Sequence, residues 1–137
     1  MELRGGCHCG NLRYVLEWPG APAAIPGRAC TCGFCTRHGA VWMAHPDAVL
    51  AVEIADAAAL SRYAFETKTA EFLVCARCGV VPVCTSRIDG REHAVVNVNT
   101  FDDPALRIEQ APVSFDGEPT TDRLARRQQR WIGTVRF

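Results

Sequence analysis

The chain has 137 residues, of which 48% are hydrophobic and 22% are charged. This length suits one domain spanning residues 1–137, and the hydrophobic content excludes intrinsic disorder as the main state. The 15 basic and 15 acidic residues give zero net charge, so no general field attracts nucleic acid or an anionic membrane, and neither is an expected partner.

The N-terminal segment contains the first cysteine pair, Cys7 and Cys9. Residues 1–6 lack the apolar stretch of a secretory signal, and no apolar run approaches the roughly 18 residues of a membrane span. We therefore expect a cytoplasmic protein whose thiols stay reduced and available to metals. Seven of the eight cysteines lie in three clusters of near neighbours, which favours metal binding over disulfides, because most disulfides join remote segments.

Cys7 and Cys9 lie in a glycine-rich segment, and alternate residues of an extended segment point to the same side. Both thiolates can therefore face one ion, while His8 between them points away. Residues 12–18 alternate apolar and polar side chains, which predicts a half-buried strand. Proline, glycine and alanine residues in segment 18–27 predict a loop.

The second cluster places three sulfurs within six residues, at Cys30, Cys32 and Cys35. A zinc ion bound by these three thiolates would keep one tetrahedral position open for water or substrate, which is typical of a catalytic site. These cysteines are therefore the candidate catalytic residues. Cys84 could close the site as a fourth ligand, but it lies in an apolar run, and free cysteine is among the most buried residue types, so we interpret it as a core thiol.

In the middle of the chain, the sequence pattern predicts a series of short strands bounded by glycine, proline or aspartate. Residues 56–60 are compatible with a single helical turn. The predicted strands are 41–44, 49–54, 60–65, 71–74, 80–85 and 94–99. This pattern indicates a mainly β fold of short antiparallel strands.

Cys75 and Cys78 form a C-x-x-C pair followed by Gly79, where a tight turn needs left-handed backbone angles. The pair supplies half of a tetrahedral site, and Cys7 with Cys9 can supply the other half. Four thiolates on zinc make a closed structural site that would fix the N-terminus to the middle of the chain. A thioredoxin-like redox pair is the alternative, but no βαβ pattern surrounds Cys75 and Cys78.

The C-terminal region contains the one predicted helix, Thr121 to Trp131, with Thr121 or Asp122 as cap and with Leu124, Gln128 and Trp131 on one face. Arginines at several positions of this region could contact nucleic acid. The neutral charge of the chain favours a solvated polar face instead. These arginines are Arg123, Arg126, Arg127, Arg130 and Arg136.

Candidate residues for proton transfer and substrate binding surround the cysteine clusters. His38 and His45 lie near the three-cysteine cluster and are candidate proton shuttles, whereas His93 is interpreted as a strand-end residue. Arginine and lysine side chains recognise carboxylates. The nearest such side chains in sequence are Arg28, Arg37, Lys68 and Arg77.

Residues 4–104 resemble the family of glutathione-dependent formaldehyde-activating enzymes and their centromere protein V relatives. The resemblance rests on four motifs in order: Gly5-Gly6-Cys7-His8-Cys9-Gly10, Cys30-x-Cys32-x-x-Cys35-x-x-x-Gly39, Cys75-x-x-Cys78-Gly79 and Val96-Asn97-Val98-Asn99-Thr100-Phe101-Asp102-Asp103-Pro104. The sequence differs from the common family pattern at residues 80–84 and at 72–74, which flank the ligands without changing them.

The resemblance implies a beta-tent fold and two zinc sites. Cys7, Cys9, Cys75 and Cys78 correspond to the structural ligands, and Cys30, Cys32 and Cys35 to the open site. It also implies a carbon–sulfur lyase that brings glutathione and formaldehyde together as S-hydroxymethylglutathione.

The leading hypothesis is therefore a zinc enzyme that makes or breaks a carbon–sulfur bond between a small-molecule thiol such as glutathione and an aldehyde. The alternative is a non-enzymatic zinc module that binds glutathione or another protein. A third hypothesis, a nucleic-acid-associated protein like the centromere relative, predicts salt-dependent DNA binding.

Overall fold

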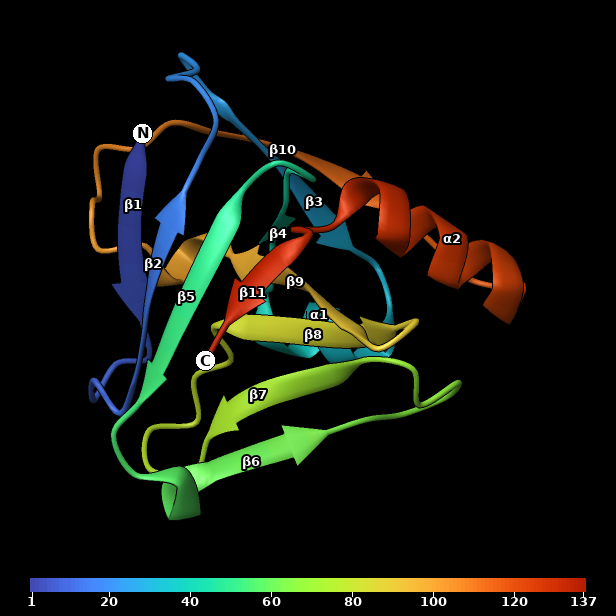
Figure 1. Cartoon of the computed structure of the whole chain (residues 1–137), viewed down its shortest axis with the longest axis horizontal. Coiled ribbons are helices and arrows are strands. Elements are labelled where there is room, and N and C mark those ends of the chain that lie inside the picture. The colour runs from blue at the N-terminus through green and yellow to red at the C-terminus, as the bar shows by residue number, and fades with distance from the viewer.

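The computed structural model describes residues 1–137 and contains two β-sheets and two α-helices (Figure 1). One sheet has four strands in the order β1-β2-β5-β11. Neighbouring strands are antiparallel apart from β11, which pairs parallel to β5. The bounds are Glu2–Gly6 for β1, Leu12–Glu17 for β2, Val49–Ile54 for β5 and Thr134–Arg136 for β11.

The other sheet has seven strands in the order β10-β3-β4-β9-β8-β7-β6. In Figure 1 its strands β6, β7 and β8 cross the direction of β1, β2 and β5 at a steep angle. The bounds are Ile108–Val113 for β10, Ile25–Cys30 for β3, Trp42–Met43 for β4, Arg91–Asn97 for β9, Val83–Ile88 for β8, Glu71–Cys75 for β7 and Leu60–Tyr63 for β6.

The main hydrophobic core contains side chains from both sheets. Alternation along the strands decides which residues enter it, because successive side chains of a strand point to opposite faces. On the seven-stranded sheet, Leu73, Val83 and Val96 belong to this core. Their neighbours Phe72, Cys84 and Val95 belong to a second apolar cluster on the opposite face. Register pairs Phe72 with Cys84 and Cys84 with Val95, so this second cluster runs across three strands.

Two helices lie beside this second cluster: α1 (Gly33–His38) follows β3, and α2 (Thr120–Arg130) follows β10. Two 3₁₀ turns, η1 (Ala57–Ala59) and η2 (Val98–Thr100), complete the secondary structure. Figure 1 places α2 at the end of the molecule next to β10 and β3. Neither helix has the length and apolar character that crossing a membrane requires.

The expected mainly β fold with a short C-terminal helix is confirmed. Most predicted strands are present; the strand predicted over 49–54 coincides with β5, and the one predicted over 80–85 is displaced to Val83–Ile88. The sequence did not indicate β1, β10 or β11. It also did not indicate α1, so the C-terminal helix is not the only helix. Segment 18–27 was expected to be a loop, but its last residues begin β3.

The expected cap of the C-terminal helix is wrong. The helix begins after Pro119, which has no side-chain cap hydrogen bond, so neither Thr121 nor Asp122 is its N-cap. Pro119 has φ −58 and ψ 146, an extended conformation that the proline ring allows at the residue before the helix. The inward face also differs from the expected one, because Gln128 is exposed and Arg127 is buried.

Candidate metal centres and the adjoining pocket

Cys7, Cys9, Cys75 and Cys78 form the first group of thiols, with all four sulfur atoms within 4.8 Å of one another. The Sγ atoms of Cys7 and Cys9 are 3.8 Å apart, and those of Cys9 and Cys75 are 3.5 Å apart. Zn–S bonds of about 2.3 Å in a tetrahedron require sulfur atoms roughly 3.8 Å apart. The spacing of this group therefore fits a zinc ion.

Two tight turns present these four thiols. Cys7 and Cys9 follow β1, whereas Cys75 ends β7 and Cys78 lies in the turn to β8. Gly79 adopts φ +77 and its N–H donates to the Cys75 carbonyl at 2.8 Å. A left-handed residue was expected here, and glycine adopts this conformation without steric cost. The group joins the four-stranded sheet to the seven-stranded sheet.

Cys30, Cys32 and Cys35 form the second group, again with all sulfur atoms within 4.8 Å. Cys30 ends β3, Cys32 caps the N-terminus of α1, and Cys35 lies in the first turn of that helix. The helical turn brings the cap and Cys35 together, because the N–H of Cys35 donates to the Cys32 sulfur at 3.3 Å. The sequence predicted the grouping of these thiols but not the helix that holds two of them.

N–H groups donate to a sulfur atom in each thiol group, and cysteine binds metal as the thiolate. The N–H of Leu12 donates to Cys7 Sγ at 3.3 Å, and the indole Nε1 of Trp42 donates to Cys35 Sγ at 3.3 Å. The hydrogen bond between the two thiols lowers the pKa of Cys30 to about 5 and raises the pKa of Cys35. Both groups could thus hold a metal ion, and their all-sulfur donor sets fit zinc.

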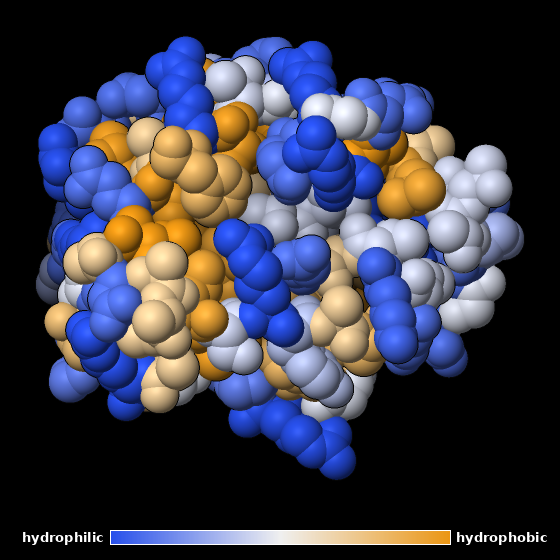
Figure 2. Space-filling model, turned by 60° about the horizontal axis from the view of Figure 1, so that its bottom comes forward, coloured by the Kyte–Doolittle hydropathy of each residue, from blue (hydrophilic) through white to orange (hydrophobic).

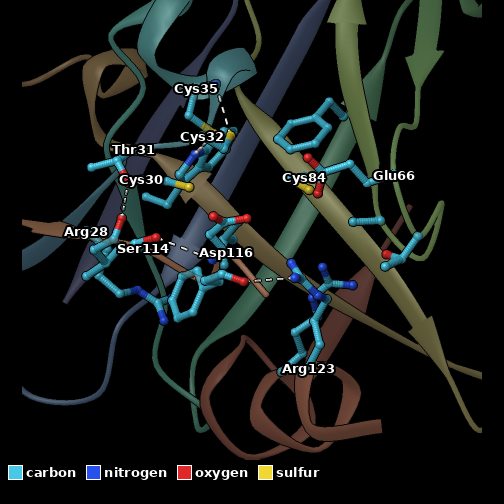
Figure 3. A pocket seen from close by; sticks show the side chains of 18 of the residues that line it. Arg28, Cys30, Thr31, Cys32, Cys35, Glu66, Cys84, Ser114, Asp116 and Arg123 are labelled. Atoms are coloured by element: carbon cyan, nitrogen blue, oxygen red, sulfur yellow. Dashed lines mark hydrogen bonds between the residues drawn. The ribbon is translucent and has the colours of Figure 1, made fainter. Parts of the chain in front are cut away.

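A cavity of about 400 Å³ adjoins the three-thiol group and is lined by Cys30, Cys32 and Cys35. Its floor is the second apolar cluster, including Trp42, Phe72 and Trp131, and Figure 3 shows Arg123 of α2 across the cavity from the three cysteines. The four-thiol group contributes no lining residue. The two groups therefore differ in their access to a small molecule.

The C-terminal segment reaches the cavity through the parallel pairing of β10 with β3. Register places Val113 opposite Cys30, and the N–H of Thr31 donates to the Val113 carbonyl at 2.9 Å. Residues 114–116 then continue along the cavity wall, and Figure 3 shows Ser114 and Asp116 there. Helix α2 follows and contributes arginines to the same wall.

The expected solvated arginine face of α2 is wrong for three of its members, because Arg123, Arg126 and Arg127 line the cavity. Arg126 forms hydrogen bonds with both carboxylate oxygens of Glu118 at 3.1 Å, and its guanidinium lies 3.6 Å from the ring centre of Phe115. The neutral charge of the chain favoured a solvated face for these arginines and gave no sign of Glu118 and Phe115, their partners in the preceding loop. Arg130 and Arg136 are exposed as expected.

Among the candidate anion-binding residues near the clusters, only Arg28 lines the cavity. Arg77 pairs with Asp56 at 2.6 Å, and Arg37 donates to the Gly33 carbonyl at 2.8 Å. Lys68 lies beside a different, more polar depression. These three are therefore placed away from the cavity.

No histidine lines the cavity, so the two candidate proton shuttles are not placed there. His38 is exposed and packs on Phe34, and His45 accepts a hydrogen bond from the N–H of Asp47. His8 is exposed as expected, and His93 is buried near the start of β9. The carboxylates that line the cavity belong to Glu66 and Asp116.

Cys84 is buried in the second apolar cluster and is not part of either thiol group. Its side chain reaches the cavity floor, as Figure 3 shows. Burial raises the pKa of its thiol, which therefore stays protonated. The interpretation of Cys84 as a core thiol agrees with this position.

The fold and the two thiol groups define a mainly β protein with two cysteine clusters that could hold metal ions, one of which opens to a cavity. Residues 2–114 match the model of the family described as glutathione-dependent formaldehyde-activating enzyme. This match covers most of the chain, and the protein belongs to that family. No curated protein matches the chain significantly.

A solved structure is also similar: a crystal structure of a Rhodobacter sphaeroides protein with 30% sequence identity and a TM-score of 0.55. The alignment covers 77% of this chain and 99% of that one. The family match ends at residue 114, ahead of α2 and its arginines.

Proposed function

We propose that this chain is a zinc-dependent enzyme of the carbon–sulfur lyase type that forms or cleaves an adduct of glutathione and formaldehyde resembling S-hydroxymethylglutathione. The observation that carries this proposal is the cavity beside the three-thiol group in a chain of this family. We also propose that residues 1–137 act as one domain and that the protein is cytoplasmic.

The two thiol groups have different roles in this proposal. Cys7, Cys9, Cys75 and Cys78 would hold a structural zinc, because they lie outside the cavity and complete a tetrahedron. Cys30, Cys32 and Cys35 would hold a second zinc with an open position. When bound there, zinc supplies a Lewis acid that lowers the pKa of a thiol or polarises a carbonyl oxygen.

The chain's own residues position the reactants. Adduct formation joins the thiol sulfur to the carbonyl carbon and moves the thiol proton to the carbonyl oxygen. Trp42, Phe72 and Trp131 give the cavity an apolar floor that limits water around the reacting atoms. Glu66 and Asp116 are the lining carboxylates and are assigned the transfer of this proton, directly or through water.

The experiment measures exchange between formaldehyde, glutathione and their adduct by NMR saturation transfer, since the adduct also forms without protein. Wild-type protein is compared with Cys32→Ser and with buffer containing the same zinc concentration. Faster exchange with wild type alone is expected. Equal exchange in all three samples would remove the enzymatic function and leave the chain as a non-enzymatic zinc module.

A further inference from the structure

Arg127 of α2 is buried in the cavity wall without an acidic partner. Its exposed fraction is 6%, and it lines the cavity. Arg123 and Arg126 share the carboxylate of Glu118, at 3.8 Å and 3.1 Å. Arg127 forms no ion pair within 4.0 Å, although buried charges in proteins are normally paired. Its guanidinium carbon lies 4.9 Å from the ring centre of Trp131, a cation–π contact that supplies no negative counter-charge.

The hydrogen bonds of the Arg127 guanidinium are incomplete. Its Nη1 donates to Thr69 Oγ1 at 2.9 Å and to Ser86 Oγ at 3.2 Å, and both acceptors are neutral hydroxyls. Its Nε is buried and has no partner. Most buried donors in native proteins are satisfied, so a buried guanidinium with a free N–H calls for a specific explanation.

The surroundings do not need Arg127 for their own hydrogen bonding. Ser86 Oγ donates to the Thr69 carbonyl at 2.7 Å, and the hydroxyls of Thr67 and Thr69 are 2.8 Å apart. Both hydroxyl acceptors therefore keep a partner if the arginine is removed. Burial lowers the pKa of Arg127 to about 10, which reflects the cost of holding this charge without a counterion. The missing partner is best explained as an anion that enters the cavity.

The cavity favours a carboxylate over a phosphate. Guanidinium binds both groups through paired N–H donors. However, Glu66 and Asp116 line the same cavity, and their negative charge opposes a dianion more than a monoanion. Arg28 also lines the cavity and forms no ion pair within 4.0 Å, which adds a second positive charge near the entering group.

We propose that Arg127 binds a carboxylate of the thiol substrate, and that the enzyme therefore selects thiols that carry this group. The proposal rests on the proposed function for the assignment of the thiol, and it adds a specificity-determining residue from α2, outside the segment that matches the family. Helix α2 lies across the cavity from the three-thiol group (Figure 3), so one molecule can place its thiol and its carboxylate at opposite walls.

The test uses S-methylglutathione and its diethyl ester, which lack a free thiol and so report binding without turnover. Calorimetry on zinc-loaded protein compares wild type with Arg127→Met, Arg127→Lys and the control Arg130→Met. Arg130 is exposed on the same helix and does not line the cavity. We expect wild type and the control to prefer the acid, Arg127→Met to bind it about 10- to 100-fold more weakly, and Arg127→Lys to retain part of the preference.

Thermal unfolding separates binding from a structural role. Arg127→Met removes an uncompensated charge, so its unfolding temperature is expected to equal or exceed that of wild type. Unchanged acid binding by Arg127→Met, equal loss of acid and ester, or no acid preference in wild type would each overturn the proposal. If Arg127→Met does not fold, the ratio of the affinities for the acid and the ester is measured on Arg127→Lys instead. A ratio equal to that of wild type would then overturn the proposal. Acid preference without adduct exchange would contradict the proposed function alone, and exchange without acid preference would contradict this inference alone.

Discussion

The indole of Trp42 and the thiol of Cys35 are joined by a hydrogen bond from Nε1 to Sγ, at 3.3 Å. Trp42 lies on β4 in the cavity floor, while Cys35 belongs to α1. The bond therefore fixes the helix that presents two thiols against the sheet beneath the cavity. Groups that orient a metal ligand in this way also tune its affinity for metal.

Trp42→Phe is expected to weaken metal retention at the three-thiol group about 10-fold, because it removes this N–H donor while keeping an aromatic ring. The measurement is zinc transfer to a competing chelator. The four-thiol group serves as the internal control, since it lies away from Trp42. Equal loss from both groups, or from neither, would contradict the expectation.

Cys78→Ser is expected to abolish one zinc site and lower the free energy of unfolding by about 4 kcal/mol or more, since this group joins the two sheets. Elemental analysis and urea unfolding measure the two effects. Cys32→Ser is the matched control and should also lose one zinc, with a smaller loss of stability. A wild-type zinc content in Cys78→Ser would exclude the four-thiol assignment.

Cys84→Ala is expected to keep the zinc content of wild type, because Cys84 lies outside both thiol groups. It should lower the free energy of unfolding by about 1 kcal/mol, through loss of a small buried side chain. Elemental analysis compares the zinc content of this variant with that of wild type. Loss of a metal ion in this variant would instead indicate the closed, four-ligand arrangement of a zinc-stabilised scaffold.

Stability should depend on pH through Glu118, whose pKa is held below its usual 4.5 by hydrogen bonds from Arg126. A carboxylate with a lowered folded-state pKa stabilises the fold above its unfolded pKa, and this contribution is lost as pH falls through the folded pKa. The difference in unfolding free energy between wild type and Glu118→Gln should therefore be largest near neutral pH and shrink below about pH 4.5. Metal release at low pH affects both proteins and cancels in this difference. A difference that is constant with pH would show that the pair does not act this way.

Gly5→Ala is expected to destabilise the fold by about 3 kcal/mol, because the added Cβ would overlap the Thr100 carbonyl and the Tyr14 hydroxyl. Gly20→Ala is the control: it has φ +73 and open space, so only backbone strain of about 1 kcal/mol is expected. Chemical unfolding of both variants measures the difference. Equal costs would argue against the close contact of β1 with the segment around Thr100.

Strands with clear alternation were predictable from the sequence, and the rest were not, for local reasons. The alternating segment predicted over 12–18 contains β2, in which Leu12, Tyr14 and Leu16 are buried. The apolar run predicted over 49–54 coincides with β5. Strand β1 contains Gly5 and Gly6, and β3 contains Pro26 and Gly27, residues that usually indicate turns. Helix α1 has only six residues, which is too short for a helical period to be recognised.

The sequence likewise predicted one part of the candidate site, the thiol groups, and missed another part, the cavity wall. The grouping of thiols was predictable because chelation depends on local spacing, as in Cys75 and Cys78, and on alternation, as in Cys7 and Cys9. The cavity wall was not predictable, because Arg127 reaches it only through the pairing of β10 with β3. Arginine on a short helix is usually solvated, and only tertiary contacts reverse this expectation.

The parallel register that sets Val113 beside Cys30 has an evolutionary consequence. The ladder between β10 and β3 consists of main-chain hydrogen bonds, so the residues that follow β10 can change without replacing any of the three cysteines. A chimaera that exchanges the segment after residue 114 between relatives would keep the thiol groups of one parent and take the cavity-lining arginines of α2 from the other.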